Sequence, residues 1–539
     1  MGNNRLIILF SALLFFFVQL TAQDRNTSYL ASGGKMDPLQ AIMDIRHYTI
    51  ALDVDIAQQS INGYAIADII LSQQTDTILF NLAHLMVVKK ITVNKKSGNY
   101  FQQGDFVFIT KPHGFAAGRQ SIKIEYGGKP PVAAHPPWEG GFSWKKDSHG
   151  NPWVVINCQS EGGDVYFPCK DYPGDEPNEG VDLFITVPRG LTVAGPGLLQ
   201  SVKNQNNNKV TFHWKTNYTI SNYCVVFNIA KYKLVSRDYT SLSGNKVPMQ
   251  FYVLEEDTAY AQHVLDIRER DTKILEKYFG EYPWIKEKIG IAEVPNPGME
   301  HQTMVTYGDK FRYKKVAGQD YSDNLFHEFS HEWWANKVTN KDWAHMWIQE
   351  GIATYAEALF FRETAGESAY DSMELVWKMR IQNKKPVVQG DEVTEADTYT
   401  GDVYHKGAFF MHTLRYVLGD SIFFPALKEL ATDQKYTYDN FVTTGDVQQL
   451  FSKRFGKDLK PLFDFYLRTI NRLEINVQQT AFNEYTIQSA NCPMLLPLEI
   501  ITDQGVKKVM LGNESFKIKS KTLPVIDAKG YYLKKISIL

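Results

Sequence analysis

The sequence predicts a multidomain α+β protein with a β-rich N-terminal part, a helix-rich middle part and a small β-rich C-terminal part. Apolar and polar residues alternate from Asp44 to about residue 235, which is the period of half-buried strands. From about residue 258 the apolar period becomes that of helices, and short alternating runs return after Asn476. The length of 539 residues allows several domains, because one domain takes about 100–200 residues.

The N-terminal part shows the clearest alternation. We expect a β domain of the sandwich kind over residues 44–240, after a polar, flexible lead-in over residues 24–43. Asn62-Gly63 and Gly127-Gly128 are turn signals between the runs. The alternating runs that predict strands are 48–56, 181–187 and 223–229, the first with Tyr48, Ile50, Leu52, Val54 and Ile56 on one face.

The middle part, residues 241–475, is predicted to be mostly helical. Gly280 and Pro283 end its first helix. The expected helices cover about residues 258–279, 320–337, 349–363, 405–418, 446–455 and 460–470. Residues 476–539 form the small C-terminal part, with short strands expected at 496–500, 507–511, 516–519 and 531–536.

Residues 1–23 have the pattern of a signal peptide. Arg5 precedes an apolar run over residues 6–18, and small residues follow near Ala22. The run is shorter than the about 20 residues that span a bilayer. We therefore expect cleavage near Ala22 or Gln23, export to the periplasm or the extracellular space, and no stable membrane insertion afterwards. An uncleaved membrane anchor is the alternative.

Charge and cysteine content add two expectations. The formal net charge of −2 gives no basic surplus, so we expect no nucleic acid as a partner. The 4 cysteines show no C-x-x-C spacing, and the sequence leaves disulfides and buried thiols equally open.

The strongest functional signal is the sequence HEFSH at residues 327–331. Residues four apart on a helix share a face, so His327 and His331 can bind one ion. Glu328 lies beside them, where a general base for an activated water is needed. Glu350 follows after eighteen further residues and, on a second helix, completes a His₂Glu ligand set. Such a set suits one Zn²⁺ per chain in a hydrolytic enzyme, whereas a chance motif with structural histidines is the alternative.

Two nearby residues have a weaker case. Glu357 lies seven positions after Glu350 on the same helical face, where it either orients a metal ligand or faces solvent. His345 stands between Trp343 and Trp347, and we predict that it is structural rather than a ligand.

Residues 327–341 and the sequence WIQEG at 347–351 resemble the gluzincin aminopeptidases typified by aminopeptidase N, which form peptidase family M1. The signature of this family is H-E-x-x-H, eighteen residues, then Glu. The resemblance extends from about Asp44 to the C-terminus. It implies a β-saddle or sandwich domain, a thermolysin-like zinc catalytic domain and a small C-terminal β-sandwich, and we expect the long helical C-terminal domain of many members to be absent.

The resemblance also implies where a substrate amine binds. The sequence PGMEH at 297–301 is similar to the family's G-x-M-E-N, so Glu300 is expected to bind the α-ammonium group of a peptide. Gly298 and Met299 would line the substrate site. By similarity, Gln159 would help to hold the amine, and a structural loop is the alternative.

Two further features come from the same comparison. Tyr404, in the sequence YHKGA at 404–408, is expected to donate its hydroxyl to the oxyanion. Tyr399, five residues earlier, could line the same pocket, but we favour a packed aromatic. The chain departs from the family motif at two positions. Pro297 has no N–H to donate, and His301 stands where Asn is usual and could titrate near neutral pH.

Together these observations predict a zinc-dependent aminopeptidase that acts on peptides with a free amino terminus, with Glu328 as general base. A thermolysin-like endopeptidase is the first alternative, because it shares the zinc helix and needs no amine anchor. Epoxide hydrolysis, as in a leukotriene-processing hydrolase with the same motifs, is another. A non-catalytic zinc-binding protein is the least favoured, because binding alone requires neither Glu328 nor Tyr404.

Overall fold

A computed structural model describes residues 30–539. Their contacts divide the chain into two compact units. The first contains the chain up to Asp266, Trp284–Phe311 and Thr394–Ala396, and the second contains Ile267–Pro283, Arg312–Val393 and Asp397–Leu539. The expected multidomain α+β class is confirmed, with N-terminal sheets, a helical region and C-terminal sheets. The domain boundaries at 240/241 and 475/476 stay predictions, and the signal peptide lies outside the described residues.

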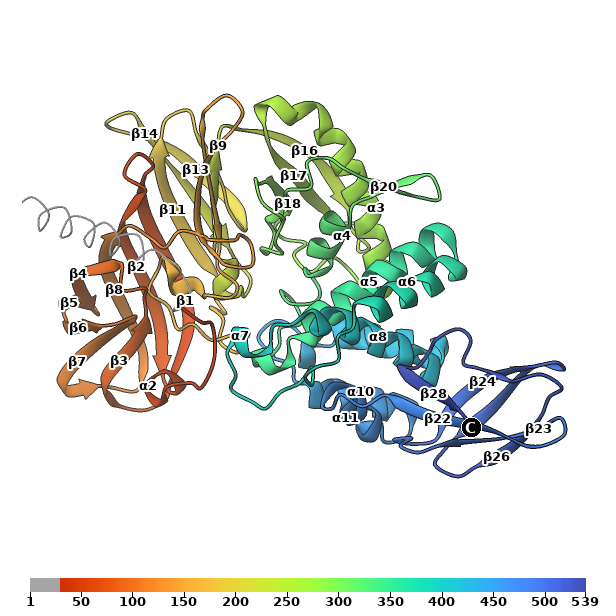
Figure 1. Ribbon diagram of the computed structural model, residues 1–539. Coiled ribbons are helices and arrows are strands. Elements are labelled where there is room, and N and C mark those ends of the chain that lie inside the picture. The colour runs from red at the N-terminus through yellow and green to blue at the C-terminus, as the bar shows by residue number, and fades with distance from the viewer. Residues whose placement is uncertain (1–29) are drawn as a thin grey trace, which may run out of the picture. The chain divides into compact units, whose positions relative to one another are not determined.

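The first unit is built on an eight-stranded sheet (Figure 1). Its central strand, β1, pairs antiparallel with β2 and parallel with β11. The predicted face of β1 is buried from Tyr48 to Val54, whereas Ile56 lies beyond the end of the strand. In spatial order the strands are β13 (Leu198–Gln205), β14 (Lys209–Thr216), β11 (Val181–Pro188), β1 (Met43–Asp55), β2 (Ser60–Leu71), β8 (Gly118–Gly128), β4 (Met86–Val93) and β5 (Lys96–Ser97).

Smaller sheets complete the first unit, and the predicted amine-binding residues lie on loops next to the strands of two of them. Gln159 follows β10, and Glu300 lies on the connection between β18 and β19. The sheets are β12 (Thr192–Ala194), β15 (Asn228–Ala230), β10 (Pro152–Asn157), β9 (Gly141–Lys146); β16 (Tyr232–Thr240), β17 (Lys246–Leu254), β18 (Ile289–Glu293), β19 (Val305–Tyr307); and β3 (Thr75–Asn81), β7 (Phe106–Phe115), β6 (Asn99–Gln103).

The strand expected at 223–229 is wrong for most of its length. The chain forms a 3₁₀ turn over Asn222–Cys224, and only the short strand β15 follows. Every residue from 221 to 230 is buried, so the alternating apolar residues here do not mark one face of a half-buried strand.

The second unit contains the helices that carry the metal motif (Figure 1). Two of them, α5 and α8, pack very closely at Gly351 and Gly407. A Cβ atom added to Gly351 would lie 2.8 Å from the Cα of Gly407. This contact fixes the helix of Glu350 against the helix of Tyr404. The helices are α3 (Ala261–Phe279, which crosses the unit boundary), α4 (Asp323–Ser330), α5 (Trp347–Ala365), α6 (Glu367–Arg380), α8 (Gly401–Leu418), α9 (Asp420–Thr432), α10 (Thr444–Phe455) and α11 (Lys460–Leu467).

Most of the expected helices are present, with three differences. The helix predicted at 320–337 ends at Ser330, because the chain turns there and buries Trp333 and Trp334 in the turns that follow. Helices α6 and α9 were not predicted. The spacing of buried residues in α6 is nevertheless helical, with Tyr370, Met373, Glu374 and Trp377 on one face.

The C-terminal strands form two small sheets, and the segment before the last strand packs against α8. The rings of Tyr416 and Tyr531 stack with centroids 3.6 Å apart, and Thr413 Oγ1 donates to the carbonyl of Tyr531 at 2.7 Å. The strands are β26 (Phe516–Lys519), β23 (Glu484–Ser489), β22 (Leu473–Ala481), β28 (Lys534–Ile538) in one sheet, and β25 (Gly505–Leu511), β24 (Leu496–Thr502), β27 (Val525–Ile526) in the other.

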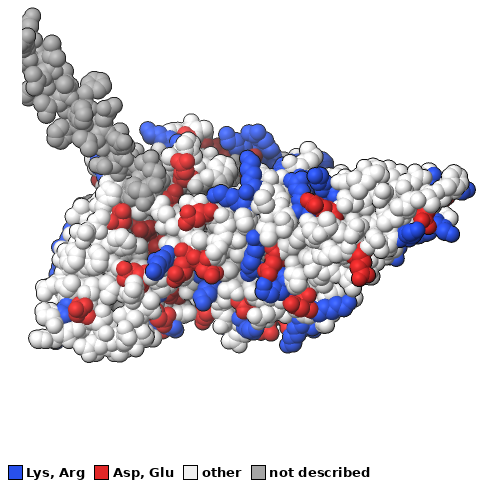
Figure 2. Space-filling view, turned by 60° about the horizontal axis from the view of Figure 1, so that its bottom comes forward, with Lys and Arg blue, Asp and Glu red and all other residues white. Residues whose placement is uncertain are grey.

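Several surface and terminal features bear on the earlier expectations. Basic and acidic side chains are intermixed on the face seen in Figure 2. Within residues 30–539, none of the helices combines the length and apolar character needed to cross a bilayer.

The described part of the predicted flexible lead-in packs on the first unit, where the N–H of Ser32 donates to Ser160 O at 2.9 Å. The cysteines are buried thiols rather than disulfides in this part of the chain.

Candidate metal centre

Helix α4 positions the first two predicted ligands. Ser322 caps its start by accepting a hydrogen bond from the N–H of Leu325 at 3.0 Å. Phe326 and Phe329 are buried and hold the helix against the interior of the unit. His331 lies at the C-cap with φ −65° and ψ −16°, which is still right-handed helical backbone. It therefore stays on the same helical face as His327.

The three predicted ligand atoms converge on one point. The two Nε2 atoms of His327 and His331 are 3.2 Å apart. Glu350 Oε2, from the first turn of α5, lies 3.4 Å from His327 Nε2 and 3.3 Å from His331 Nε2. Glu350 and His331 are buried, with exposed fractions of 3% and 1%. This is the prearranged geometry that one shared cation needs.

The outer nitrogens of both imidazoles are held by other groups. His327 Nδ1 lies 2.9 Å from Glu357 Oε1, and His331 Nδ1 lies 2.7 Å from the carbonyl oxygen of Trp334. With the Nδ1–H groups donating, both Nε2 atoms keep free lone pairs for a metal. Glu357 therefore contacts a candidate ligand instead of facing solvent, and the Trp334 contact was not predicted.

Replacing Glu357 by alanine is expected to weaken zinc binding about 10–100-fold, because His327 loses the group that orients it. The affinity can be measured by competition with a chromophoric chelator. The matched control is Glu363→Ala, which removes a carboxylate from the same helix that instead pairs with Lys277. An unchanged affinity in Glu357→Ala, equal to that of the control, would contradict the orienting role.

The charge state of Glu350 suits a ligand. Burial alone raises the pKa of its carboxyl group. When the histidines carry a proton on Nε2, the positive charge of His331 and hydrogen bonds from both histidines lower this pKa to about 2. Glu350 is therefore ionised throughout the neutral range. An ionised carboxylate and two imidazoles are the donor set that Zn²⁺ takes in catalytic sites, so the residues present fit a zinc ion.

The candidate base and oxyanion donor line a cavity next to these ligands. The cavity has a volume of about 460 Å³, and Glu328, His327 and Tyr404 form part of its wall. Glu328 accepts a hydrogen bond from Asn324 Nδ2 at 3.0 Å. The ring of Tyr404, on α8, lies 5.9 Å from the ring of His327. The side chains of His327, Glu328, Tyr404 and Asn324 all belong to the second unit.

Tyr399 is more than the packed aromatic that was expected. Its hydroxyl lies 2.8 Å from the hydroxyl of Tyr404. If Tyr399 donates in this pair, the hydroxyl oxygen of Tyr404 accepts, and the contact fixes the position of the Tyr404 hydroxyl. His345, in contrast, is structural as predicted. It is buried and lies 3.1 Å from Thr444 Oγ1, and burial lowers its pKa to about 4.

The predicted amine-binding residues come together in the first unit. Glu300 is buried, and its Oε1 accepts hydrogen bonds from Gln159 Nε2 and from the hydroxyl of Tyr223, each at 2.9 Å. Met299 is also buried, with its N–H donating to Thr306 Oγ1 at 2.8 Å, and Gly298 is buried beside it. Tyr223 was missed, because no local spacing connects it with Glu300.

One expectation for this segment is wrong. His301 is fully buried, and this burial lowers the pKa of its imidazole to about 3. It therefore stays neutral and does not titrate near pH 7. Pro297 is exposed, so its lack of an N–H group removes no donor from the interior of the unit.

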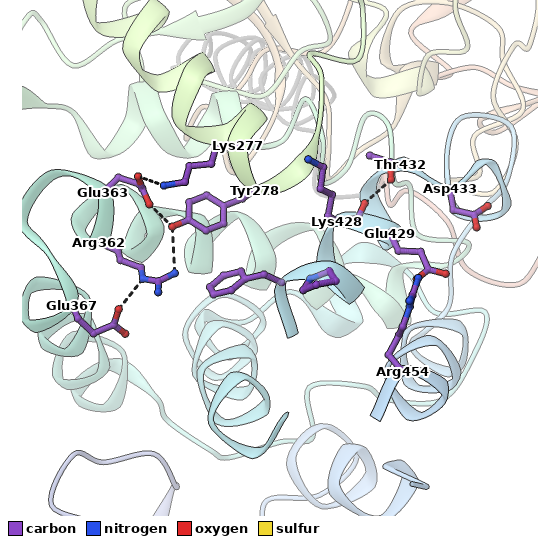
Figure 3. Close-up of a pocket in the computed structure, with 12 residues that line it drawn as sticks. Lys277, Tyr278, Arg362, Glu363, Glu367, Lys428, Glu429, Thr432, Asp433 and Arg454 are labelled. Atoms are coloured by element: carbon purple, nitrogen blue, oxygen red, sulfur yellow. Dashed lines mark hydrogen bonds and ion pairs between the residues drawn. The ribbon is translucent and has the colours of Figure 1, made fainter. Parts of the chain in front are cut away.

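A larger cavity lies elsewhere in the second unit, among the ends of α3, α5, α6, α9 and α10 (Figure 3). Its volume is about 1100 Å³, but none of the metal-motif residues lines it. Six of its charged side chains form ion pairs with one another, so size alone does not identify the functional site. The ion pairs are Lys277–Glu363, Arg362–Glu367 and Arg454–Glu429.

Comparisons with known proteins decide the family. A model of the peptidase M1 N-terminal domain matches residues 45–224, and a model of the peptidase family M1 domain matches residues 264–466. The two matches together cover well over half of the chain. The chain belongs to peptidase family M1. The resemblance seen in the metal motif is thereby confirmed.

Similar M1 proteins include enzymes named as aminopeptidases. The chain is 24% identical to aminopeptidase 2, mitochondrial, of Saccharomyces cerevisiae over 60% of this chain and 34% of that protein. It is 23% identical to human endoplasmic reticulum aminopeptidase 1 over 73% of this chain and 44% of that protein. The chain thus spans between about a third and a half of the length of these relatives.

A solved M1 structure has the same fold. The M1 zinc metallopeptidase from Deinococcus radiodurans superposes with a TM-score of 0.68 at 20% identity, covering 83% of this chain and 98% of that one. A mutant of that enzyme has been solved with a Tyr-Ser-Ala substrate, with a TM-score of 0.66. At this identity the likeness supports the multidomain fold of the M1 chain and no finer property.

Proposed function

We propose that the protein is a zinc-dependent aminopeptidase, which hydrolyses amino acids from the free amino terminus of peptides. The convergence of His327, His331 and Glu350 beside Glu328 carries this proposal. Membership of family M1 and similarity to named aminopeptidases support it. The buried Glu300, with its two hydrogen-bond donors, supports exopeptidase rather than endopeptidase action, because a fixed carboxylate binds a cationic amine.

The proposed reaction is the hydrolysis of the first peptide bond. Zinc held by these residues would supply a Lewis acid that polarises the carbonyl and lowers the pKa of water to about 7. Glu328 accepts a proton as the oxygen of water attacks the carbonyl carbon. The C–N bond then breaks, and Glu328 returns the proton to the leaving amine. The products are a free amino acid and a peptide shortened by one residue.

Other side chains position the substrate and stabilise charge. We assign to Tyr404 the donation of its hydroxyl to the developing oxyanion, a kind of contact worth about 3–4 kcal/mol in known enzymes. Tyr399 would orient that hydroxyl. Glu300, with Gln159, would bind the α-ammonium group, and Gly298 and Met299 would lie along the substrate.

The test is a panel of fluorogenic aminoacyl amides beside their N-acetylated forms, with and without a zinc chelator. We expect cleavage of the free-amine compounds only, lost on chelation and restored by zinc, because acetylation removes the positive charge that Glu300 binds. Cleavage of the blocked compounds at a similar rate would overturn the aminopeptidase assignment in favour of an endopeptidase. Absence of zinc-dependent cleavage in both sets would overturn the peptidase assignment.

We also propose that the protein acts in the periplasm or outside the cell. The signal-peptide pattern of residues 1–23 supports this location. Amino-terminal sequencing of the protein from its source tests it, with a start after residue 22 or 23 as the expected result. A start at Met1 would contradict cleavage.

A further inference from the structure

The cavity beside Glu328 has a wall that the metal motif does not explain. Helix α6 contributes Met373, Val376, Trp377 and Arg380, whose spacing of i, i+3, i+4 and i+7 places them on one helical face. We call this face the α6 wall. Helices α4, α5 and α8 complete the cavity, whose volume of about 460 Å³ is in the range of small-ligand sites.

The cavity lies on the leaving-group side of the proposed reaction. Glu328 must come within hydrogen-bond distance of the leaving nitrogen in order to protonate it. The residues that follow the scissile bond are attached to this nitrogen. A cavity that begins at Glu328 is therefore placed to receive the part of the peptide after the cleaved bond. This step rests on the proposed function.

Most charged groups of the cavity already have partners. Asp323 pairs with Lys314, and Glu357 holds His327. His405 is neutral at pH 7, because its half-buried position and then the nearby charge of Arg380 lower its pKa to about 4. The guanidinium group of Arg380 forms no hydrogen bond or ion pair in the described range 30–539, and the residue is exposed.

An unpaired guanidinium at the end of a partly apolar cavity favours one kind of ligand group. A planar carboxylate accepts two parallel hydrogen bonds from arginine, and such charge-assisted bonds are stronger than neutral ones. Met373, Val376 and Trp377 line the cavity and make the α6 wall apolar beside Arg380. On the leaving side of a short peptide, the carboxylate at hand is the C-terminal one.

We propose that Arg380 binds the C-terminal carboxylate of short peptide substrates. Arg380 is then a specificity residue for the leaving part of the peptide. The assignment gives the leaving part of the peptide an anchor of its own in the second unit.

The test measures binding separately from turnover. Ala-Ala-Ala and its C-terminal amide are titrated into zinc-loaded Glu328→Gln protein by calorimetry, alone and combined with Arg380→Gln, Arg380→Lys or Lys384→Gln. Lys384 is an exposed cation four residues beyond Arg380 that does not line the cavity, so it controls for general charge. The same peptides are then used as substrates of the protein with Glu328 intact.

We expect the free acid to bind about tenfold or more tightly than the amide, as a charge-assisted hydrogen bond allows. Arg380→Gln should remove this preference, Arg380→Lys should keep part of it, and Lys384→Gln should leave it intact. Equal binding of acid and amide, or a preference that survives Arg380→Gln, would overturn the proposal. Loss of all turnover with an Arg380-dependent preference would overturn the proposed hydrolysis and leave the carboxylate site standing.

Discussion

Replacing Glu328 by glutamine is expected to lower the turnover of a free-amine substrate about 10³-fold or more while one zinc per chain stays bound. General acid–base groups contribute about 10²–10⁴-fold to rate, and here one carboxylate serves in both proton transfers. Glutamine keeps the size of the side chain and can still accept the hydrogen bond from Asn324. It cannot take up a proton from water.

Steady-state kinetics and metal analysis of the same preparation check this prediction. Glu429→Gln is the matched control, because it removes a carboxylate from α9 of the same unit, outside the cavity of Glu328. The control should keep wild-type turnover. Turnover of Glu328→Gln within a few-fold of the control would show that another group acts as base.

Replacing His331 by alanine is expected to abolish both zinc binding and activity. The side chain supplies one of the three ligand atoms of a buried site. A catalytic zinc ion takes three protein ligands, so the two that remain would bind it much more weakly. We expect zinc affinity to fall more than about 100-fold, beyond the about 10–100-fold expected for an outer partner such as Glu357. The two variants thus form a graded pair.

Thermal unfolding with added zinc tests the ligand role independently of activity. A metal present at about 1,000 times its dissociation constant stabilises the folded state by about 4 kcal/mol, so zinc should raise the melting temperature of the wild-type protein. His331→Ala should show no such rise. A variant that retains one zinc per chain after dialysis, with an unchanged zinc-dependent rise, would exclude His331 as a ligand.

The metal ligands could be predicted because their geometry is mostly local. A four-residue spacing on α4 brings two imidazoles together, and this holds even though the assigned helix ends one residue before His331. Glu350 needed a second helix, whose position depends on the close contact between Gly351 and Gly407. The family motif identified Glu350 as the third ligand, which the periodicity of apolar residues could not do.

Other parts of the site depend on contacts between distant segments. Tyr223 reaches Glu300 from a turn that was expected to be a strand, and the hydroxyl pair of Tyr399 and Tyr404 depends on how the chain enters α8. Helix α6 was overlooked although its buried residues have helical spacing, and with it the position of Arg380. The sequence pattern was therefore sufficient to predict α6. The side-chain partners of Glu300 and Tyr404 depend instead on tertiary packing, which no local pattern shows.

The measurement that tests the metal centre most directly is anomalous X-ray diffraction from crystals of the zinc-loaded protein, collected on both sides of the zinc absorption edge. We expect one strong peak per chain, about 2.0–2.2 Å from Nε2 of His327, Nε2 of His331 and a carboxylate oxygen of Glu350, and present only above the edge. A zinc peak at another group of side chains, with these three left without metal, would contradict the account.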